Sequence, residues 1–279
     1  MADYQLAIGT LTLGAGTDYQ LRGGPEGLGL PDLRTSDTPR PQDHGLFWGS
    51  DYFGKRTVTL DVTILGDDPG DAAAKMDALA AVWQPPAGSE ATVPLTVDLP
   101  GQVARTLDGR PRRAAYNLDN LKAGIIVATL QYEAADPRLY SAETVLSTAA
   151  ATTGGGRTYN RVYPLVYAAG GTGGTILVTN VGNFASRPIL RVNGPSNTPR
   201  IENITAGQFL AANLAVAAGE YLEFDLDAHT VMLNGTASRY GSLVAGSSWW
   251  EIAPGANSIR FTSADSAGTL DVHFRSAWL

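Results

Sequence analysis

The segment Arg56-Thr57-Val58-Thr59-Leu60-Asp61-Val62-Thr63-Ile64-Leu65 decides the class of fold. Its apolar residues, Val58, Leu60, Val62 and Ile64, alternate with threonines and an aspartate, and many of the ten are β-branched. This period of two indicates a strand with one buried face and one wet face. Antiparallel sheets are the ones that leave a face in water, so the segment predicts an antiparallel β-sheet.

The residues after this strand predict a single amphipathic helix, from Asp71 or Ala72 to Trp83. Leu79 and Trp83 recur at helical spacing, and the acids at the start of the helix complement its macrodipole. Pro85-Pro86 then ends it. One helix of about a dozen residues cannot form a bundle, so we expect it to lie on the sheet.

The rest of the first half predicts further strands and one long loop. Two or three short strands are expected within Tyr4–Arg22, and longer ones at Val93–Leu99, Val103–Leu107, Arg112–Leu118 and Ile125–Tyr132. Gly23–His44 is rich in Gly, Pro and Asp, with few side chains to offset its ordering entropy. We expect it to be a long loop that a partner or the domain surface orders.

Residues 147–158 are almost all Gly, Ser, Thr or Ala and predict a linker, with a long internal loop as the alternative. The chain is therefore divided into a domain at 1–146, this linker, and a domain at 159–279. Short strands are expected at Val162–Tyr167, Thr175–Val181, Pro188–Val192, Tyr221–Leu226, Val231–Leu233, Ser247–Ile252, Ser258–Phe261 and Leu270–Phe274. Strands at this spacing, with turn signals between them, predict an all-β sandwich.

Composition and charge exclude several classes of function. The 279 residues include 20 Lys and Arg against 27 Asp and Glu, a net charge of −7 that argues against a phosphate-binding surface. The one basic cluster, Arg105, Arg110, Arg112 and Arg113, is interpreted as a solvated or acid-paired hairpin rather than a nucleic-acid site. With no Cys and three His, we expect no disulfide, cofactor or metal, and the sequence predicts neither a secretory signal nor a membrane span.

No enzyme signature stands out, since the glycine runs lack a phosphate-loop pattern and no serine lies in a nucleophile elbow. Glu223, Asp225 and Asp227 share one face of a predicted strand, a spacing that fits a glycosidase pair or calcium ligands. A water-facing strand has the same pattern, and this second interpretation is favoured. We expect no catalytic residues.

Trp249, Trp250 and Tyr240 are the candidate glycan or interface residues. Aromatic faces suit pyranose rings, which favours a sugar-stacking surface. Adjacent strand residues point to opposite faces, so a core tryptophan beside an interface tryptophan is the alternative, and it is the one preferred.

Several segments, in order along the chain, resemble the siphophage distal tail protein family. They are Phe47–Arg56 leading into Thr57–Leu65, the helix ending at Trp83, Gly109–Arg113, Ala135–Tyr140, Tyr163-Pro164, Asn234-Gly235, Trp249–Ile259 and Arg275–Leu279. The resemblance implies an N-terminal antiparallel β-barrel-like belt domain with one α-helix, whose six copies close into a ring. It also implies a C-terminal galectin-like β-sandwich.

The implied role is that of a homohexameric adaptor in the phage tail tip, assembled in the host cytoplasm and with no catalytic residues. Its implied partners are itself, the tail tube protein, the tail-associated hub protein and receptor-binding or baseplate proteins. DNA would pass the lumen without specific binding, and no membrane is contacted. We expect Gly23–His44 to contribute to contact between subunits. The alternative function is a carbohydrate-binding module for host-surface adsorption.

Overall fold

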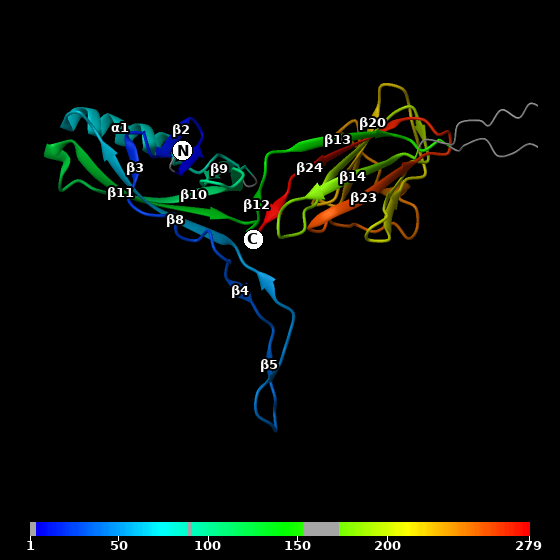
Figure 1. Cartoon of the computed structure of the whole chain (residues 1–279), viewed down its shortest axis with the longest axis horizontal. Coiled ribbons are helices and arrows are strands. Elements are labelled where there is room, and N and C mark those ends of the chain that lie inside the picture. Colours follow the sequence, from blue (N-terminus) through cyan, green and yellow to red (C-terminus); the bar gives the residue numbers. More distant parts are fainter. Residues whose placement is uncertain (1–3, 89–90, 153–172) are drawn as a thin grey trace, which may run out of the picture. The chain divides into compact units, whose positions relative to one another are not determined.

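The computed structural model describes residues 4–88, 91–152 and 173–279. The chain divides into two compact units, residues 1–142 with Leu279 (unit 1) and residues 143–278 (unit 2). Both are built mainly of antiparallel strands, and one α-helix occurs within the described ranges (Figure 1). The predicted class of fold, mainly β with one helix in the first half, is confirmed.

Unit 1 is a nearly closed, barrel-like sheet in the strand order β2-β1-β9-β10-β11-β8-β3, with β12 paired to β10. The two end strands, β2 and β3, follow each other in the chain, which brings the edges of the sheet together. The elements are β1 (Gln5–Ile8), β2 (Leu11–Gly14), β3 (Tyr19–Leu21), β8 (Arg56–Leu65), α1 (Pro69–Val82), β9 (Val93–Asp98), β10 (Arg105–Asn117), η1 (Leu121–Ala123), β11 (Ile125–Ala134) and β12 (Leu139–Tyr140).

The central pair is β8 with β11, joined over ten residue pairs from Arg56↔Ala134 to Leu65↔Ile125. The alternating residues of β8 from Arg56 to Ile64 are all buried, which is the register that the sequence pattern predicts for the apolar ones. Because a slip by one residue would turn this face outward, the alternation specifies the pairing.

β10 is one long strand where the sequence predicts two. Its first half pairs with β9 and its second half with β11, and a register shift lies between Pro111 and Arg113. Proline lacks a ladder donor and so sits at this irregularity. Gly109 is required nearby, because a Cβ there would lie 2.3 Å from the Glu133 carbonyl oxygen. A bulged strand thus serves both halves of the sheet.

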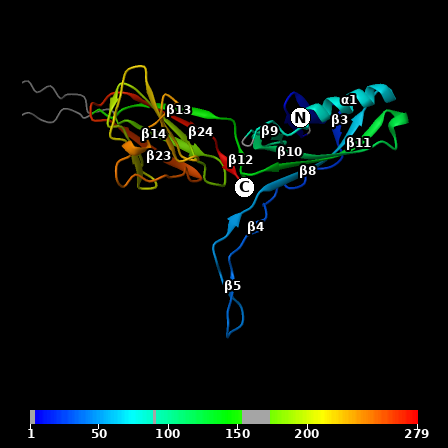
Figure 2. The ribbon, with the colours of Figure 1, turned by 180° about the vertical axis from the view of Figure 1, so that it is seen from behind.

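The helix α1 begins at Pro69, two or three residues before the predicted start at Asp71 or Ala72, and lies against β8 and β11 (Figures 1 and 2). Asp68 caps it by accepting from Asp71 N at 2.8 Å, and Pro69 occupies the first turn, where no amide donor is needed. At the other end Trp83 is buried and its Nε1 donates to Arg113 O at 3.0 Å, which ties the helix to β10.

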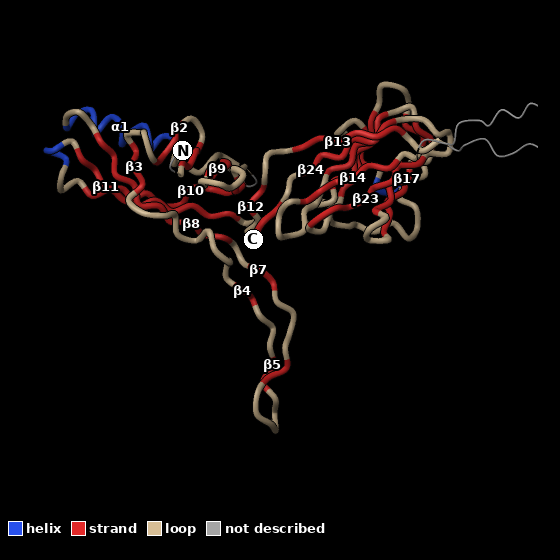
Figure 3. Tube along the Cα trace, in the orientation of Figure 1, coloured by secondary structure: helices blue, strands red, loops and turns tan. Residues whose placement is uncertain are grey.

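Residues 23–55 are a hairpin arm, which corrects the expectation of a plain loop at Gly23–His44. Two-residue strands pair across it: β4 (Leu33–Arg34) with β7 (Tyr52–Phe53), and β5 (Thr38–Pro39) with β6 (Leu46–Phe47). The arm extends away from the sheet of unit 1 and is mostly irregular between these pairs (Figure 3). Pro and Gly limit each pairing to two residues.

Unit 2 is a sandwich of a six-stranded sheet, β13-β24-β15-β20-β21-β22, and a four-stranded sheet, β14-β23-β17-β18, with a separate pair β16-β19. The bounds are β13 (Thr144–Ala149), β14 (Thr175–Asn180), β15 (Ile189–Asn193), β16 (Ser196–Asn197), β17 (Arg200–Asn203), β18 (Gln208–Ala211), β19 (Ala215–Val216), β20 (Tyr221–Asp225), β21 (Thr230–Leu233), β22 (Ala237–Ser238), η2 (Tyr240–Ser242), β23 (Gly255–Thr262), β24 (Thr269–Phe274) and β25 (Ala277–Trp278). Its core includes Val192, Phe224, Trp250 and Phe261. The likeness to galectins stays a prediction.

Two sequence expectations for the second half differ from the structure. The division between units falls after Ala142, and residues 144–149 form β13, so the first residues of the expected linker at 147–158 are a strand. Residues 153–158 and the strand expected at Val162–Tyr167 lie outside the described residues. Ser247–Ile252 has a single bridge rather than a ladder, because Ser248 N donates to Phe209 O and the Ser247 hydroxyl bonds the backbone of Ala211.

Tyr132 provides a test of how unit 1 is held together. Its fully buried hydroxyl lies 2.5 Å from Val93 O and 2.9 Å from Leu107 O, which joins β11 to β9 and β10. Tyr132→Phe leaves these carbonyls without that donor and should destabilise the protein by about 1–3 kcal/mol in urea unfolding. Tyr52→Phe, at an exposed position, should stay within about 0.5 kcal/mol of the parent. Equal unfolding midpoints for the two variants would contradict this role.

Candidate functional site

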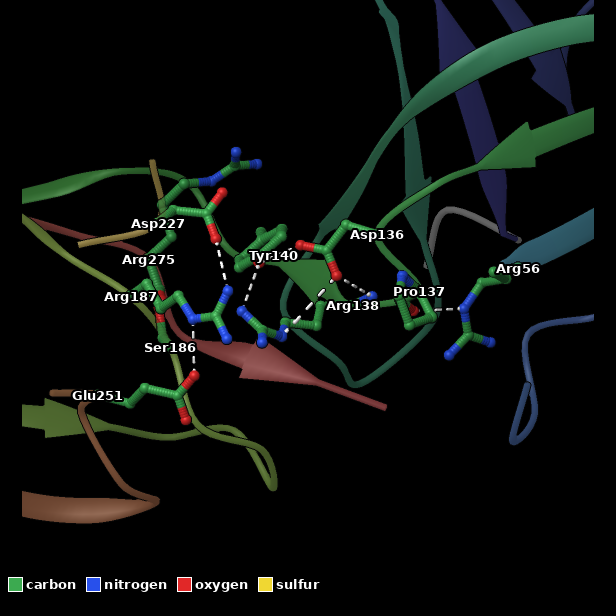
Figure 4. Close-up of polar contacts among 10 residues, drawn as sticks. All are labelled: Arg56, Asp136, Pro137, Arg138, Tyr140, Ser186, Arg187, Asp227, Glu251 and Arg275. Atoms are coloured by element: carbon green, nitrogen blue, oxygen red, sulfur yellow. Dashed lines mark hydrogen bonds and ion pairs between the residues drawn. The ribbon is translucent and has the colours of Figure 1, made fainter. Parts of the chain in front are cut away.

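The arm of unit 1 is held at its root by Arg56, which is only 1% exposed. Its Nε donates to Pro137 O at 2.7 Å (Figure 4), and its Nη1 donates to Gly27 O at 2.9 Å and also to Gly29 O. Burial lowers the pKa of Arg56, but arginine stays protonated in proteins. One buried cation therefore binds three backbone carbonyls, two of them on the limb that begins the arm.

The Pro137 carbonyl is positioned by a polar turn, also drawn in Figure 4. Asp136 accepts from Arg138 N at 3.1 Å and from the Tyr140 hydroxyl at 2.6 Å. Arg138 Nη1 lies 3.4 Å from the same hydroxyl. These bonds fix the turn whose carbonyl accepts from Arg56. The turn lies in Ala135–Tyr140, one of the segments that carry the family resemblance.

Backbone contacts complete the root of the arm. Glu26 and Thr59 exchange hydrogen bonds of 3.0 and 3.1 Å, which pairs the first limb of the arm with β8. Gly27 has φ +89°, and a Cβ there would lie 1.9 Å from Thr57 O. Only glycine fits this close approach in a left-handed conformation, so the limb leaves the sheet at a fixed point.

Farther out, polar side chains bridge the two limbs around Trp48. Gly49 N donates to Asp37 Oδ1 at 2.8 Å, and Ser50 N donates to Ser36 Oγ at 3.0 Å. A Cβ at Gly49 would lie 2.4 Å from atoms of Ser36, so the limbs can approach only at a glycine. These bonds replace a strand ladder and leave the Trp48 indole outside the hairpin.

The arm carries large apolar side chains in water. Trp48 is 84% exposed, and its neighbours in this exposed set are Leu30, Leu33, Leu46, Phe47 and Tyr52. The guanidinium carbon of Arg40 lies 5.1 Å from the centre of the Phe47 ring, so Arg40 covers this ring in part. An exposed set of this kind on a thin hairpin marks an interaction surface.

A second candidate site is a pocket in unit 2 beside Trp249. Trp250 is 2% exposed and belongs to the core, whereas Trp249 is half-buried and Tyr240 is exposed. The Trp249 ring stacks with His229, at 4.9 Å between centroids, and with Tyr240 at 6.4 Å. The structure thus brings two of the three sequence-predicted residues together and adds His229, a turn residue with φ +54° that no sequence pattern singled out.

Arg187 forms the polar side of this pocket. Its Nε donates to Glu251 at 2.7 Å and its Nη1 to Asp227 at 2.9 Å (Figure 4). The two hydrogen bonds between Ser186 and Ile252 set Arg187 opposite Glu251, and Ser186 Oγ donates to Arg275 O at 2.6 Å. These two carboxylates and the guanidinium therefore form a fixed cluster.

The carboxylates of Glu223, Asp225 and Asp227, in β20 and the turn after it, each bind a different partner. Glu223 pairs with Arg191 at 2.8 Å, and Asp225 accepts from Asp227 N and Ala228 N in the following turn. Asp227 pairs with Arg187. A water-facing strand and its turn account for the spacing, and nothing in these contacts favours a glycosidase pair.

Of the four arginines of β10, Arg110 and Arg112 have defined partners. Arg110 donates to Ala91 O and Gly88 O, and Arg112 donates to Glu133, which Lys55 also contacts. Lys55, and then Arg112, lower the pKa of the Glu133 carboxyl. Burial lowers the pKa of Arg105, and Arg113 is exposed. This arrangement agrees with the acid-paired interpretation rather than with a phosphate-binding face.

Across residues 4–88, 91–152 and 173–279, no group of three or more His, Asp or Glu side chains is placed to hold a metal ion. In the same part of the chain, the helix is too short and too polar to cross a bilayer.

Comparisons with known proteins concern the sequence of unit 2 and the fold of the chain. Residues 181–278 match the family model described as siphovirus-type tail component, C-terminal domain. The fold is similar to the Dit (gp 19.1) protein of phage SPP1, described as a paradigm of hub adsorption apparatus in phages infecting Gram-positive bacteria. The two are 16% identical with a TM-score of 0.69, and the match covers 99% of each chain.

A chain of the phage P2 baseplate, in its activated conformation with Ca, is also similar, at 11% identity and a TM-score of 0.52 over 97% of each chain. No curated protein matches the sequence. The family match in unit 2 and the shared fold confirm the resemblance to the siphophage distal tail protein family.

Arg56 can be tested as the anchor of the arm. Arg56→Met leaves three backbone carbonyls without their charged donor, so the amides of Glu26 and Gly54 should exchange at least about tenfold faster in hydrogen–deuterium exchange. The amides of β1 should be unaffected. Arg22→Met, at an exposed arginine just before the arm, is the matched control and should leave all of these rates unchanged. Unchanged exchange at Glu26 in the Arg56 variant would show that the root is held by the backbone alone.

Proposed function

We propose that this chain is a distal tail adaptor of a siphophage, a structural protein whose six copies form a ring between the tail tube and the tail tip or baseplate. The family match and the shared fold support a tail hub or baseplate protein located in the virion tail. The ring, the channel within it and assembly in the host cytoplasm belong to the proposal. Its action is assembly, and no catalytic step is proposed.

The exposed arm of unit 1 is the feature that supports the proposed ring. A two-stranded hairpin is marginal in water even with a packed face, and within the described residues these short strands pair only with one another. The exposed aromatic residues of the arm therefore gain a large hydrophobic free energy when another surface covers them. The rigid root at Arg56 aims the arm at a fixed position, as a contact repeated around an axis requires.

A second copy of the chain is the proposed occupant. Rings form through heterologous contacts that use two different patches on each subunit, so an arm on one copy and a receiving surface on the next satisfy the requirement. Exposed sheet edges are suitable receiving surfaces, because their unpaired backbone groups accept a further strand. Self-association of this type closes when the rotation between copies is a whole fraction of a turn.

The charge of the chain suits a conduit for DNA. Six copies at −7 carry about −42, and a lumen of like sign does not grip phosphate. The proposed partners are the last tube protein on one side, the tail-associated hub protein on the other, and receptor-binding or baseplate proteins at the periphery. DNA passes without specific binding.

The ring is tested by native mass spectrometry and negative-stain microscopy of the full chain. Six copies of 29.3 kDa give about 176 kDa, and we expect annular particles of that mass. The double variant Phe47→Ser/Trp48→Ser should shift the protein to monomers, because it removes the exposed aromatic residues of the arm.

Leu177→Ser, at a 64% exposed residue on β14 of unit 2, is the matched control and should leave the rings intact. A parent protein that stays monomeric up to ~100 µM, alone and beside its tube protein, contradicts the proposal. Rings that survive the double variant would instead mean that the arm is not the contact.

A further inference from the structure

We propose that unit 2 binds a neutral pyranose sugar in the pocket beside Trp249. The pocket has a volume of about 770 Å³ and is lined only by residues of unit 2, among them Arg187, Gln208, His229, Ser248, Trp249 and Glu251. Ligand pockets of small molecules span a few hundred to about 1,000 Å³. The volume is therefore sufficient for one or two sugar rings.

The apolar wall of the pocket is the indole of Trp249. The 4.9 Å separation and 16° angle between the Trp249 and His229 rings describe an offset stack, so the smaller imidazole covers only part of the indole. Both residues line the pocket. A pyranose presents one face of C–H groups, and a rigid, half-buried aromatic surface is what such a face packs against.

The polar wall is fixed before any ligand arrives. Glu251 accepts a hydrogen bond from Arg187 Nε and Asp227 accepts one from Arg187 Nη1, so the plane of the guanidinium is fixed. Neither bond uses Nη2. Glu251, Gln208 and Ser248 add carboxylate, amide and hydroxyl groups to the lining. Sugar hydroxyls both donate and accept, so a wall that offers both, with its charged pair preorganised, suits them.

The charges of the wall select the class of sugar. The guanidinium of Arg187 faces two carboxylates, Glu251 in the pocket lining and Asp227 beside it, so these three groups together carry one net negative charge. An anionic ligand such as a uronate or a sugar phosphate would be repelled in a partly desolvated pocket. A neutral hexose or N-acetylhexosamine avoids this repulsion.

The site differs from the sequence expectation in its members. Tyr240 stacks on Trp249 but is absent from the pocket lining, and Trp250 contributes from the core. The residues that give the pocket its polarity come from four separate segments: the one before β15, the start of β18, the β20–β21 turn and the one before β23. The site does not depend on the ring, so either proposal can fail without the other.

The test is titration of the full chain with methyl glycosides of glucose, galactose, N-acetylglucosamine, N-acetylgalactosamine and rhamnose, followed by calorimetry and tryptophan fluorescence. At least one of these neutral sugars should bind with a Kd of about 10 mM or tighter, and glucuronate should bind at least about threefold more weakly than glucose. Trp249→Ala should weaken binding by about tenfold or more.

Leu177→Ala, at an exposed residue of β14 outside the pocket lining, is the control and should leave sugar affinity unchanged. Glu251→Gln keeps the shape of the pocket and removes one negative charge, so it should raise the affinity for glucuronate relative to glucose by about threefold. The proposal is wrong if none of the five neutral sugars binds. It is equally wrong if Trp249→Ala binds like the parent or if glucuronate binds more tightly than glucose.

Discussion

The arm of unit 1 depends on one buried cation. Arg56 occupies the inward face of β8, in the same register as the apolar residues that build the barrel, yet its guanidinium bonds backbone carbonyls of the arm root and of the 136–138 turn. A buried charge is costly without hydrogen-bond partners, and Arg56 has three carbonyl acceptors while its Nη2 is buried without one. Because two of those acceptors lie on the arm root, this side chain is stable only while the arm leaves the sheet at that point. The arginine therefore couples the fold of the barrel to the direction of the arm.

That coupling fixes the direction of the arm, which the few contacts within the arm cannot do. The hairpin has almost no core, and its limbs are joined by short pairings and by Ser36 and Asp37, which bond the opposite backbone. Its large apolar side chains are left to water, which costs free energy until a second surface covers them. Because its root is rigid, the arm loses less conformational entropy when a second surface covers its exposed tip. This favours a specific contact that recurs from copy to copy over a non-specific one.

Unit 2 has a different kind of surface. Its pocket is preformed, with Arg187 held between two carboxylates and the Trp249 ring stacked with those of His229 and Tyr240. Preorganised polar groups beside an aromatic wall suit a small ligand rather than another protein chain. The two proposals therefore rest on separate parts of the chain, assembly on unit 1 and sugar recognition on unit 2.

Local pattern in the sequence was enough for the strands with a clean period of two and for the helix ending near Trp83. It misread the arm as a loop, divided β10 in two and expected a strand at Ser247–Ile252, because in each case long-range pairing, not local periodicity, decided the backbone. The aromatic residues Trp249 and Tyr240 could be picked out as candidates by residue type alone.

The partners of Arg56, Arg187 and His229 could not be predicted from the sequence. An arginine in the inward register of an apolar strand is a visible signal, but its acceptors are carbonyls, which every residue carries, so no side-chain pattern identifies them. The sequence alone determined which residues prefer strand, helix and core. Only the tertiary structure decided which distant backbone atoms and charges meet, because those contacts exist only once the sheets have closed.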